Sequence, residues 1–600
     1  VKRDSFDCIS WRRIMSDAHL LITENMDVWT TAIKKRSSQG RGSNKKIELT
    51  GIKKLRELIL ELAVRGKLVP QDPNDEPASV LLEKIAAEKE QLIKDKKIKK
   101  TKALPEIGGS GKPFVLPNGW KFVRLEKLTE LITKGSSPKW QGVLYTENPE
   151  DILFVTSENV GAFKLKLAKK KFVERKFNEI EPRSILNHGD FLMNIVGASI
   201  GRTAIYNSDA LANINQAVCL IRSFPNLLCS QFFLNFFNST TCISYMYDKQ
   251  VDNARPNLSM SNISKFVIPV PPLAEQHRIV AKVDELMALC DQLEQQTEDS
   301  ITAHQTLVET LLATLSNSET PAEFNQNWTR IAEHFDTLFT TEHSIDQLKQ
   351  TVLQLAVMGK LVRQDPNDAP ASVLLEKIAT EKEQLIKNKK IKKQKPLPAI
   401  TEDEKPFELP SDWRWIRLGD LTNYGSSDKV EAKDTDADTW ILELEDVEKS
   451  TSKLLRKIRF SERQFKSSKN QFSNGDVIYG KLRPYLDKVL VADEDGVCTT
   501  EMIPLRAYVS VDSYFLRLLM KSPYFINYAN NSTHGMSLPR MGTDKARLAI
   551  LPLVPELEQH RIVKKVDELL TLCDQLKSRL SEAQTTQLYL ADTIVEQAVS

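Results

Sequence analysis

Two separated runs of basic side chains have the composition that contact with a phosphate backbone requires. The runs KLKLAKKKFVERK and KLLRKIRFSERQFKSSK both combine closely spaced lysines and arginines with phenylalanine. Such cations neutralise phosphates without reading sequence. A solvated charged face is the alternative, but recurrence in two otherwise divergent regions favours phosphate contact. The candidates are Lys164, Lys166, Lys169, Lys170, Lys171 and Arg175 in the first run, and Arg456, Lys457, Arg459 and Arg463 in the second.

A second set of polar side chains occupies matched positions in the two regions. Residues 134–140 (KGSSPKW) align with 424–430 (YGSSDKV), residues 189–205 with 475–491, and residues 213–218 with 498–503. Asn, Gln, Arg, Lys, Thr and Glu can hydrogen-bond to base edges, although drift of loops in a duplicated domain is the alternative for any single residue. The base-readout candidates are Lys134, Ser136, Ser137, Lys139, Trp140, Asn194, Ser199, Arg202, Asn215, Gln216, Arg255 and Asn257 in the first region, and Ser426, Ser427, Lys481, Arg483, Tyr485, Thr500, Glu501 and Arg540 in the second.

No motif for catalysis or metal binding accompanies these residues. The GGSGKPF stretch lacks the first glycine of a phosphate loop and the Ser or Thr that should follow Lys112, so we interpret it as a linker. There is no H-E-x-x-H and no paired C-x-x-C. The seven cysteines are scattered, which is typical of reduced thiols in a cytoplasmic protein. The sequence therefore predicts a binding protein without a catalytic residue, a metal ion or a cofactor of its own.

Length and composition set the limits of the fold. A chain of 600 residues should form about three to five units. No run of about 18 apolar residues predicts a membrane span, and the start of the chain has no secretion-type apolar core. The net charge of +3 is too small to indicate nucleic-acid binding by itself, so that hypothesis depends on the local basic runs.

The segments that position these residues occur twice. Residues 62–100 (LAVRGKLVPQDPND and onward) return almost unchanged at 355–393, and residues 273–293 (LAEQHRIVAKVDEL and onward) return at 557–576. A repeat this long indicates a duplicated module instead of a solenoid. Ile279, Val283, Leu286 and Cys290 follow the steps of a coiled-coil seam, and Cys573 lies on the equivalent seam, so both cysteines are predicted to be packing residues.

The pattern predicts a mixed α/β (α+β) fold in which helical rods hold two globular domains. A helix of about 40 residues spans roughly 60 Å, enough to separate two binding sites. The lysine-rich helix ends at 96–102 and 389–395 are equally compatible with DNA contact and with a solvated linker. The predicted segments are 1–47 (helical extension and linker), 48–103 (helices), 104–272 (first globular domain), 273–395 (central helices), 396–553 (second globular domain) and 554–600 (closing helix).

The paired segments are also distinctive. LAVRGKLV, PPLAEQHRIVAKVDEL and ELEQHRIVKKVDEL, with the GSSPKW loop and RPNLSMSNI, resemble the DNA-specificity subunit of type I restriction-modification systems, from about residue 20 to the end. The resemblance implies two target-recognition domains separated by conserved antiparallel helices, in a pseudo-twofold duplicated layout. Each domain would read one half of a bipartite target, and the helices would set the unread spacer. Many members begin directly at a recognition domain, whereas helices come first here, so family boundaries do not transfer directly.

The same resemblance implies partners for this chain. Two modification subunits would dock on the helices and bring S-adenosylmethionine, and two restriction subunits would bring ATP- and Mg-dependent translocation and cleavage. The target adenine would be flipped out of double-stranded DNA into the modification subunit. The chain itself would be cytoplasmic and not an enzyme. The alternatives are a stand-alone DNA-binding regulator, which should bind its site without partners, and a catalytic nuclease or methyltransferase, which should act when pure.

Overall fold

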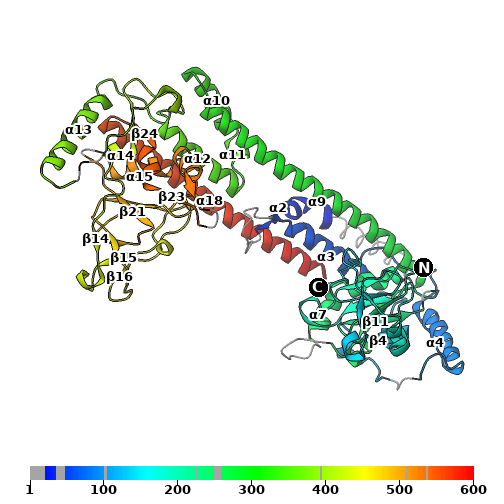
Figure 1. The fold of residues 1–600 in the computed structure, drawn as a ribbon. Coiled ribbons are helices and arrows are strands. Elements are labelled where there is room, and N and C mark those ends of the chain that lie inside the picture. The colour runs from blue at the N-terminus through cyan, green and yellow to red at the C-terminus, as the bar shows by residue number, and fades with distance from the viewer. Residues whose placement is uncertain are drawn as a thin grey trace. The chain divides into compact units, whose positions relative to one another are not determined.

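The computed structural model describes residues 21–35, 47–100, 104–224, 226–248, 258–391, 393, 395–508, 511–535 and 538–599. Of the candidate base readers, Arg255 and Asn257 lie outside the described residues. The chain forms two compact units, residues 1–300 with 583–600 and residues 301–582. The limits of these units fall inside two helices of 44 residues each, α9 (Leu273–Ser316) and α18 (Glu556–Val599) (Figure 1). The six-segment division stays a prediction.

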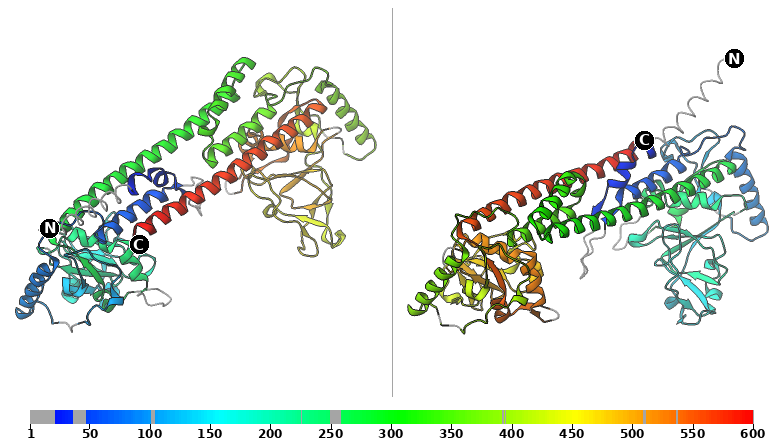
Figure 2. Two further views of the ribbon diagram at one scale, coloured as in Figure 1. Left: turned by 180° about the vertical axis from the view of Figure 1, so that it is seen from behind. Right: turned by 90° about the horizontal axis from the view of Figure 1, so that it is seen from above.

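The helices of the first unit pack through apolar stripes. The unit contains α2 (Met26–Thr31), α3 (Thr50–Val64), α4 (Ala78–Lys94) and the first part of α9, and α3 lies alongside α9 in Figures 1 and 2. The apolar stripe of α3, which includes Ile52 and Ile59, is buried. Arg56 on α3 forms an ion pair of 2.6 Å with Asp291 on α9, whereas Gln71, which follows α3, donates to Glu275 at the start of α9. The two helices are therefore antiparallel.

The mixed region of the first unit is closed by its first and last strands, since β3 (Lys121–Arg124) pairs antiparallel with β12 (Val267–Val270). Between these strands the chain forms two four-stranded sheets and short helices. The first sheet has the order β4 (Thr129–Lys134), β11 (Val218–Ser223), β8 (Phe191–Asn194), β9 (Thr203–Ile205). The second has the order β10 (Ala212–Ile214), β6 (Ile152–Val155), β7 (Phe172–Val173), β5 (Tyr145–Thr146). The remaining elements are β1 (Lys34–Lys35), β2 (Ile47–Glu48), α5 (Lys176–Ile180), α6 (Ser230–Phe237), α7 (Thr240–Asp248) and α8 (Met260–Ser264).

The second unit repeats this frame. Strand β13 (Arg414–Arg417) pairs antiparallel with β24 (Ile550–Leu553), and one sheet has the order β19 (Val489–Val491), β18 (Val477–Gly480), β21 (Met502–Leu505). The larger sheet has the order β14 (Lys429–Val430), β17 (Lys469–Phe472), β20 (Gly496–Cys498), β15 (Trp440–Leu442), β16 (Ile458–Arg459). The other elements are α10 (Pro321–Glu333), α11 (Phe335–Leu338), α12 (Glu342–Val357), α13 (Ala371–Lys387), α14 (Leu418–Leu421), α15 (Ser513–Lys521), α16 (Pro523–Asn531), β22 (Thr533–His534), β23 (Arg540–Met541) and α17 (Thr543–Leu548).

The strand pairings confirm the internal duplication and the mixed α/β class. Strand β8 is antiparallel to β11 as β18 is to β21, and β6 is parallel to β10 as β15 is to β20. Because a parallel pair within an otherwise antiparallel sheet is specific, its occurrence at matched places in both units reflects one ancestral fold. The predicted antiparallel helices are also present in the second unit, where Lys577 on α18 pairs with Asp346 on α12 at 2.8 Å and Lys349 pairs with Asp574.

The repeated LxEQHR segment joins each mixed region to its helices. Glu275 is buried and accepts hydrogen bonds from Trp120 Nε1 at 2.9 Å and Gln71 Nε2 at 3.0 Å. In the second unit the equivalent Glu558 accepts from Trp413 Nε1 at 3.0 Å and Gln364 Nε2 at 3.1 Å. Burial raises the pKa of both carboxyl groups, while these hydrogen bonds oppose the shift.

The predicted seam of α9 is buried from Ile279 to Cys290, which confirms Cys290 as a packing residue. Burial raises the pKa of the Cys290 thiol to about 11. Cys573 is likewise buried, in a cluster formed by α9, α10, α12 and α18. Neither thiol is therefore activated for chemistry. Among the helices that the structure describes, none is long and apolar enough to cross a membrane.

Gly66 follows the C-cap residue Arg65 of α3 and turns the chain away from the helix. Its φ is +70°, and a Cβ there would lie 2.5 Å from Pro117 Cγ and 3.0 Å from the Trp120 ring. Gly66→Ala should lower the free energy of unfolding of the first unit by more than 2 kcal/mol, because about 1–2 kcal/mol of left-handed strain adds to the clash. Urea unfolding followed by tryptophan fluorescence measures the change.

Gly189→Ala is the matched control, since Gly189 also has a positive φ, +90°, but a Cβ there meets no atom within 4 Å. It should lose only the strain contribution of about 1–2 kcal/mol. Equal losses in the two variants would show that the contact of Gly66 with Pro117 is unimportant.

Candidate nucleic-acid interface

Strand ends bring the predicted base readers of the first unit together. Strands β4 and β8 both run antiparallel to β11, with Lys134 opposite Cys219 and Asn194 opposite Val218. The carboxyl ends of β4 and β8 therefore lie beside the start of β11, immediately after Asn215 and Gln216. Candidates more than eighty positions apart in the chain thus share one edge of the sheet.

The GSSPKW loop reaches this edge through a close backbone approach. A Cβ on Gly135 would lie 1.9 Å from the Ile214 carbonyl oxygen, so only glycine allows the approach. Beyond it, the turn η3 (Pro138–Gln141) is held by Gln141, whose amide donates to Ser136 Oγ at 3.0 Å and to Glu181 Oε1 at 2.8 Å. Ser137 is partly buried, whereas three candidates are exposed: Lys134, Lys139 and, with 73% of its surface accessible, Trp140.

The remaining candidates of this edge differ in accessibility. Asn194 is completely buried, and its amide donates to the carbonyls of Ser157 at 3.0 Å and Val160 at 3.1 Å. This side chain holds the loop that follows β6, which argues for a positioning role. Asn215 Oδ1 accepts from Ala217 N at 3.2 Å, and Gln216 is partly exposed.

Arg202 has the opposite character. It lies at the end of the β8–β9 loop, where its backbone N–H donates to the Ser199 carbonyl. Its side chain is exposed and makes no ion pair or hydrogen bond with any other residue in the described ranges. Among the residues that the structure describes, Arg202 therefore supplies this edge with a guanidinium that is free to meet a ligand.

The second unit assembles its candidates from three chain segments. Lys481 N donates to the Glu501 carbonyl at 3.0 Å, and Glu501 accepts from Arg540 Nε at 3.0 Å and Nη2 at 2.9 Å. These hydrogen bonds raise the pKa of the Arg540 guanidinium. Arg483 N donates to the Pro539 carbonyl at 2.7 Å, which draws the β18–β19 loop against β23. Lys481, Arg483, Glu501 and Arg540 therefore form one cluster.

Arg483 is the most strained member of this cluster. It has a φ of +53° although it is not glycine, and its Nε atom is buried without a hydrogen-bond partner. Strain and an unpaired buried donor at one residue are typical of a functional position. Two residues further, Tyr485 is 53% exposed.

The serine loop of the second unit reaches the same cluster through a buried amide. Ser427 Oγ donates to Asn470 Oδ1 at 3.0 Å, and Asn470 Nδ2 donates to the Met502 carbonyl at 2.7 Å, next to Glu501. Ser426 and Thr500 are exposed on either side of this connection. The matched loops of both units therefore meet the matched strand ends.

The first basic run is presented on the surface by one buried side chain. Asn159 accepts from Thr156 N at 3.0 Å and donates to the carbonyls of Lys166 at 3.0 Å and Lys169 at 3.1 Å. All six candidates of this run are exposed. Only Lys171, 3.4 Å from Glu158, and Arg175, 3.9 Å from Asp151, form ion pairs within the described ranges. Lys164, Lys166, Lys169 and Lys170 keep their charge uncompensated by direct pairs.

The second basic run has a different electrostatic character. Arg456 and Arg463 both donate to the buried Asp446, at 2.8 and 3.0 Å, and to Glu445. Burial alone would raise the pKa of Asp446, but the hydrogen bonds from both arginines hold it below its usual value. Lys457 pairs with Asp493 at 2.7 Å and Arg459 with Glu494, so carboxylates compensate every phosphate candidate of this run. Phosphate contact stays a prediction for both runs.

Comparison with known proteins assigns the chain to a family. The family model described as the type I restriction modification DNA specificity domain matches residues 117–303. The type I restriction enzyme EcoAI specificity subunit of Escherichia coli is 39% identical over 604 residues, which covers 97% of this chain and 99% of that protein. The EcoEI specificity subunit of the same organism is 38% identical, with the same coverage. The chain belongs to the type I restriction enzyme specificity subunits.

Two solved structures are also similar. One belongs to a study of complex assembly and conformational transition of the type I R-M system, with a TM-score of 0.44 and 16% identity over 81% of this chain and 99% of that chain. The other is the HsdS subunit from Thermoanaerobacter tengcongensis, with a TM-score of 0.39 and 17% identity over 81% and 98%.

Two features of this specificity subunit concern metal and nucleotide binding. Within the described residues no group of three or more His, Cys, Asp or Glu side chains could hold a metal ion. The GGSGKPF stretch forms only the short turn η1 (Gly109–Gly111). Sequence reasoning missed two buried amides: Asn159, which holds the first basic run, and Asn470, which holds the serine loop of the second unit. Asn159 lies shortly before the first basic run and Asn470 directly follows the second, and this proximity was the local signal for them.

The exposed lysines of the first run lead to a test by salt dependence. Replacing Lys169, Lys170 and Lys171 with alanine should make the slope of log K against log salt less negative by up to about 0.9 for each lost phosphate contact. The measurement is DNA binding by the assembled enzyme between low and moderate salt concentrations.

A matched control replaces Lys97, Lys99 and Lys100, which follow α4, with alanine and changes the net charge equally. This control should leave the slope unchanged if those lysines belong to a solvated linker. An unchanged slope in the first variant would contradict the phosphate assignment.

Proposed function

We propose that this chain is the non-catalytic DNA-recognition subunit of a type I restriction-modification enzyme, and that each of its two domains reads one half of a bipartite double-stranded target. The observation that carries the proposal is the repeated frame with unlike side chains at its strand ends. The first frame presents Trp140, Arg202 and Gln216, and the second presents Lys481, Arg483 and the Glu501–Arg540 pair. One fold with two sets of hydrogen-bonding groups suits two different half-sequences.

The proposed readers have the chemistry of major-groove recognition. An arginine can donate two hydrogen bonds to guanine, and an amide can both donate to and accept from adenine. Arg202 and Gln216 supply these groups in the first domain, and Arg483 and Lys481 supply donors in the second. The exposed lysines beside the first set would hold the backbone and fix the register.

The proposed partners follow from the assembly to which such subunits belong. Two modification subunits, which would carry S-adenosylmethionine, would dock on the conserved helices and methylate an adenine flipped out of the duplex. Two restriction subunits would bring ATP and Mg for translocation and cleavage. The near-identity of the two copies of the helical segment supports this layout, because it presents one kind of surface twice. The buried cysteines described in the structure are unpaired, which supports action in the reducing cytoplasm.

The decisive experiment is sequencing of methylated adenines in cells that express the chain with its modification subunits. Arg202→Ala should weaken binding by about 1–3 kcal/mol, the range for one good base contact, and should relax the bases of one half-site only. Arg483→Ala should relax the other half-site. The two effects should be separate because Arg202 lies in the first recognition domain and Arg483 in the second.

Two outcomes would contradict this proposal. If each variant lowered methylation equally for every target sequence and left the preferred bases unchanged, these arginines would be phosphate contacts. Methylation by the purified chain without a partner would show that the chain is itself catalytic.

A further inference from the structure

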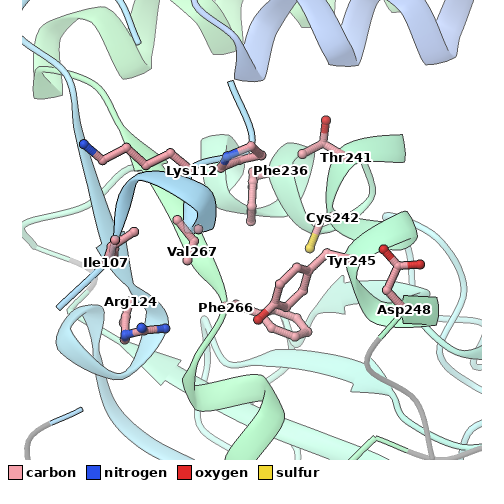
Figure 3. A pocket seen from close by; sticks show the side chains of 13 residues that line it. Ile107, Lys112, Arg124, Phe236, Thr241, Cys242, Tyr245, Asp248, Phe266 and Val267 are labelled. Carbon is pink, nitrogen blue, oxygen red and sulfur yellow. The ribbon is translucent and has the colours of Figure 1, made fainter. Parts of the chain in front are cut away.

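The first unit contains a cavity that none of the candidate base readers lines. Its volume is about 380 Å³, and it lies between the linker that follows α4, the strands β3 and β12, and the helices α6 and α7 (Figure 3). The aromatic rings of Phe236, Tyr245 and Phe266 form its apolar wall, and Arg124 and Asp248 lie at opposite sides of it in the view of Figure 3. The cavity is large enough for a small organic molecule.

The internal duplication supplies a second copy of this place. Arg124 ends β3 as Arg417 ends β13, and both guanidinium groups make the same backbone contacts. Arg124 Nε donates to the Pro105 carbonyl at 2.9 Å and Nη1 donates to that of Lys265 at 3.1 Å. Arg417 Nε donates to the Pro398 carbonyl at 2.8 Å and Nη1 donates to that of Leu548 at 2.7 Å.

The third nitrogen of the two guanidinium groups differs. Arg417 Nη2 donates to both carboxylate oxygens of Glu404, at 3.1 and 2.9 Å. Glu404 ends the short turn η6 (Glu402–Glu404), and the matching turn η1 ends at Gly111. Arg124 Nη2 makes no hydrogen bond within the described residues. The first unit therefore keeps the arginine but lacks the carboxylate.

A second difference opens the space beside this arginine. In the second unit Tyr524 packs its ring against Phe407 and Trp415, with centroids 5.7 and 6.2 Å apart, and its hydroxyl donates to the Ile550 carbonyl at 3.0 Å. The matching residue of α7 is Thr241, in the aligned stretches FNSTTCISY and MKSPYFINY. Its hydroxyl donates to Glu61 at 2.6 Å. The cavity thus arises where the second unit has a phenol ring and a carboxylate.

We propose that this cavity binds a small aromatic monocarboxylate, whose carboxylate pairs with Arg124 and whose ring stacks among Phe236, Tyr245 and Phe266. Lys112 also lines the cavity, but its side chain extends away from the aromatic rings in Figure 3, so Arg124 and Asp248 are the charges that flank the rings. The negative charge of Asp248 favours a hydrogen-bond donor at the far end of the ligand and disfavours a dianion such as a phosphate monoester. The Arg124 charge already acts on this wall, because it opposes the rise in the pKa of Tyr245 that burial causes. A bound carboxylate would connect the linker to β3 as Glu404 does in the second unit.

The test uses 4-hydroxyphenylacetate as the probe and the full chain as the receptor, with saturation-transfer NMR and calorimetry. The wild-type chain should bind the probe saturably. Gly111→Glu should weaken binding by about tenfold or more, because the new carboxylate occupies Arg124 and the ligand loses a charge-assisted hydrogen bond. A Cβ at Gly111 meets only Ile107, at an ordinary 3.5 Å, so the variant should fold. Arg124→Gln should weaken binding similarly.

Gly109→Glu is the matched control, because it adds the same charge in the same turn, where a Cβ meets no atom within 4 Å and the residue does not line the cavity. It should bind the probe as the wild type does, and neutral 4-hydroxyphenylacetamide should not bind. Three results would each overturn the proposal: no saturable binding to the wild-type chain, undiminished binding to Gly111→Glu, or binding of phenyl phosphate but not of the carboxylate.

Discussion

Each copy of the module depends on one buried carboxylate. Glu275 and Glu558 begin their long helices, and each accepts hydrogen bonds from a tryptophan of the mixed region and from a glutamine that follows the antiparallel helix. Removing a carboxylate from water is costly, and these partners offset much of that cost only when all three segments are in place. The interaction therefore specifies how a recognition domain is mounted on its helices. Because it occurs twice with the same partners, both domains have the same relation to their own helices.

Because this interaction fixes the shared fold of the two copies, the sequences of the loops that follow their strands can differ without disturbing it. The β8–β9 and β18–β19 loops share almost no residues, yet they leave equivalent strands and lie beside equivalent turns. Differences between the copies can then be interpreted position by position. At the carboxyl ends of the matched strands the two copies carry different hydrogen-bonding side chains. Beside Arg124 and Arg417, at the ends of β3 and β13, the second copy has the carboxylate of Glu404 where the first has Gly111. On the proposed function, the first kind of difference concerns the DNA target, and the second concerns the cavity beside Arg124.

Local periodicity predicted much of the fold. The seam through Cys290 was predictable because its residues lie a few positions apart, and the duplication was predictable because its two copies are almost identical in sequence. The candidate site was less predictable. Strand β8 is buried on both faces, so no alternation revealed that Asn194 faces the interior. The compensation of Arg459 by Glu494 connects residues 35 positions apart, and a local count of positive charges cannot include such a partner.

The two basic runs show why counted charge is a poor measure of DNA attraction. The exposed lysines of the first run that form no ion pairs need not break any contact within the protein to meet a phosphate. Phosphate binding there would therefore release counterions with a gain of entropy and little rearrangement. Arg456 and Arg463 would have to leave or share Asp446, which is fully buried and would lose its hydrogen bonds. Their guanidinium groups are instead held in fixed positions. On the proposed function, long-range attraction would come mainly from the first domain, while the second would contribute preorganised groups at close range.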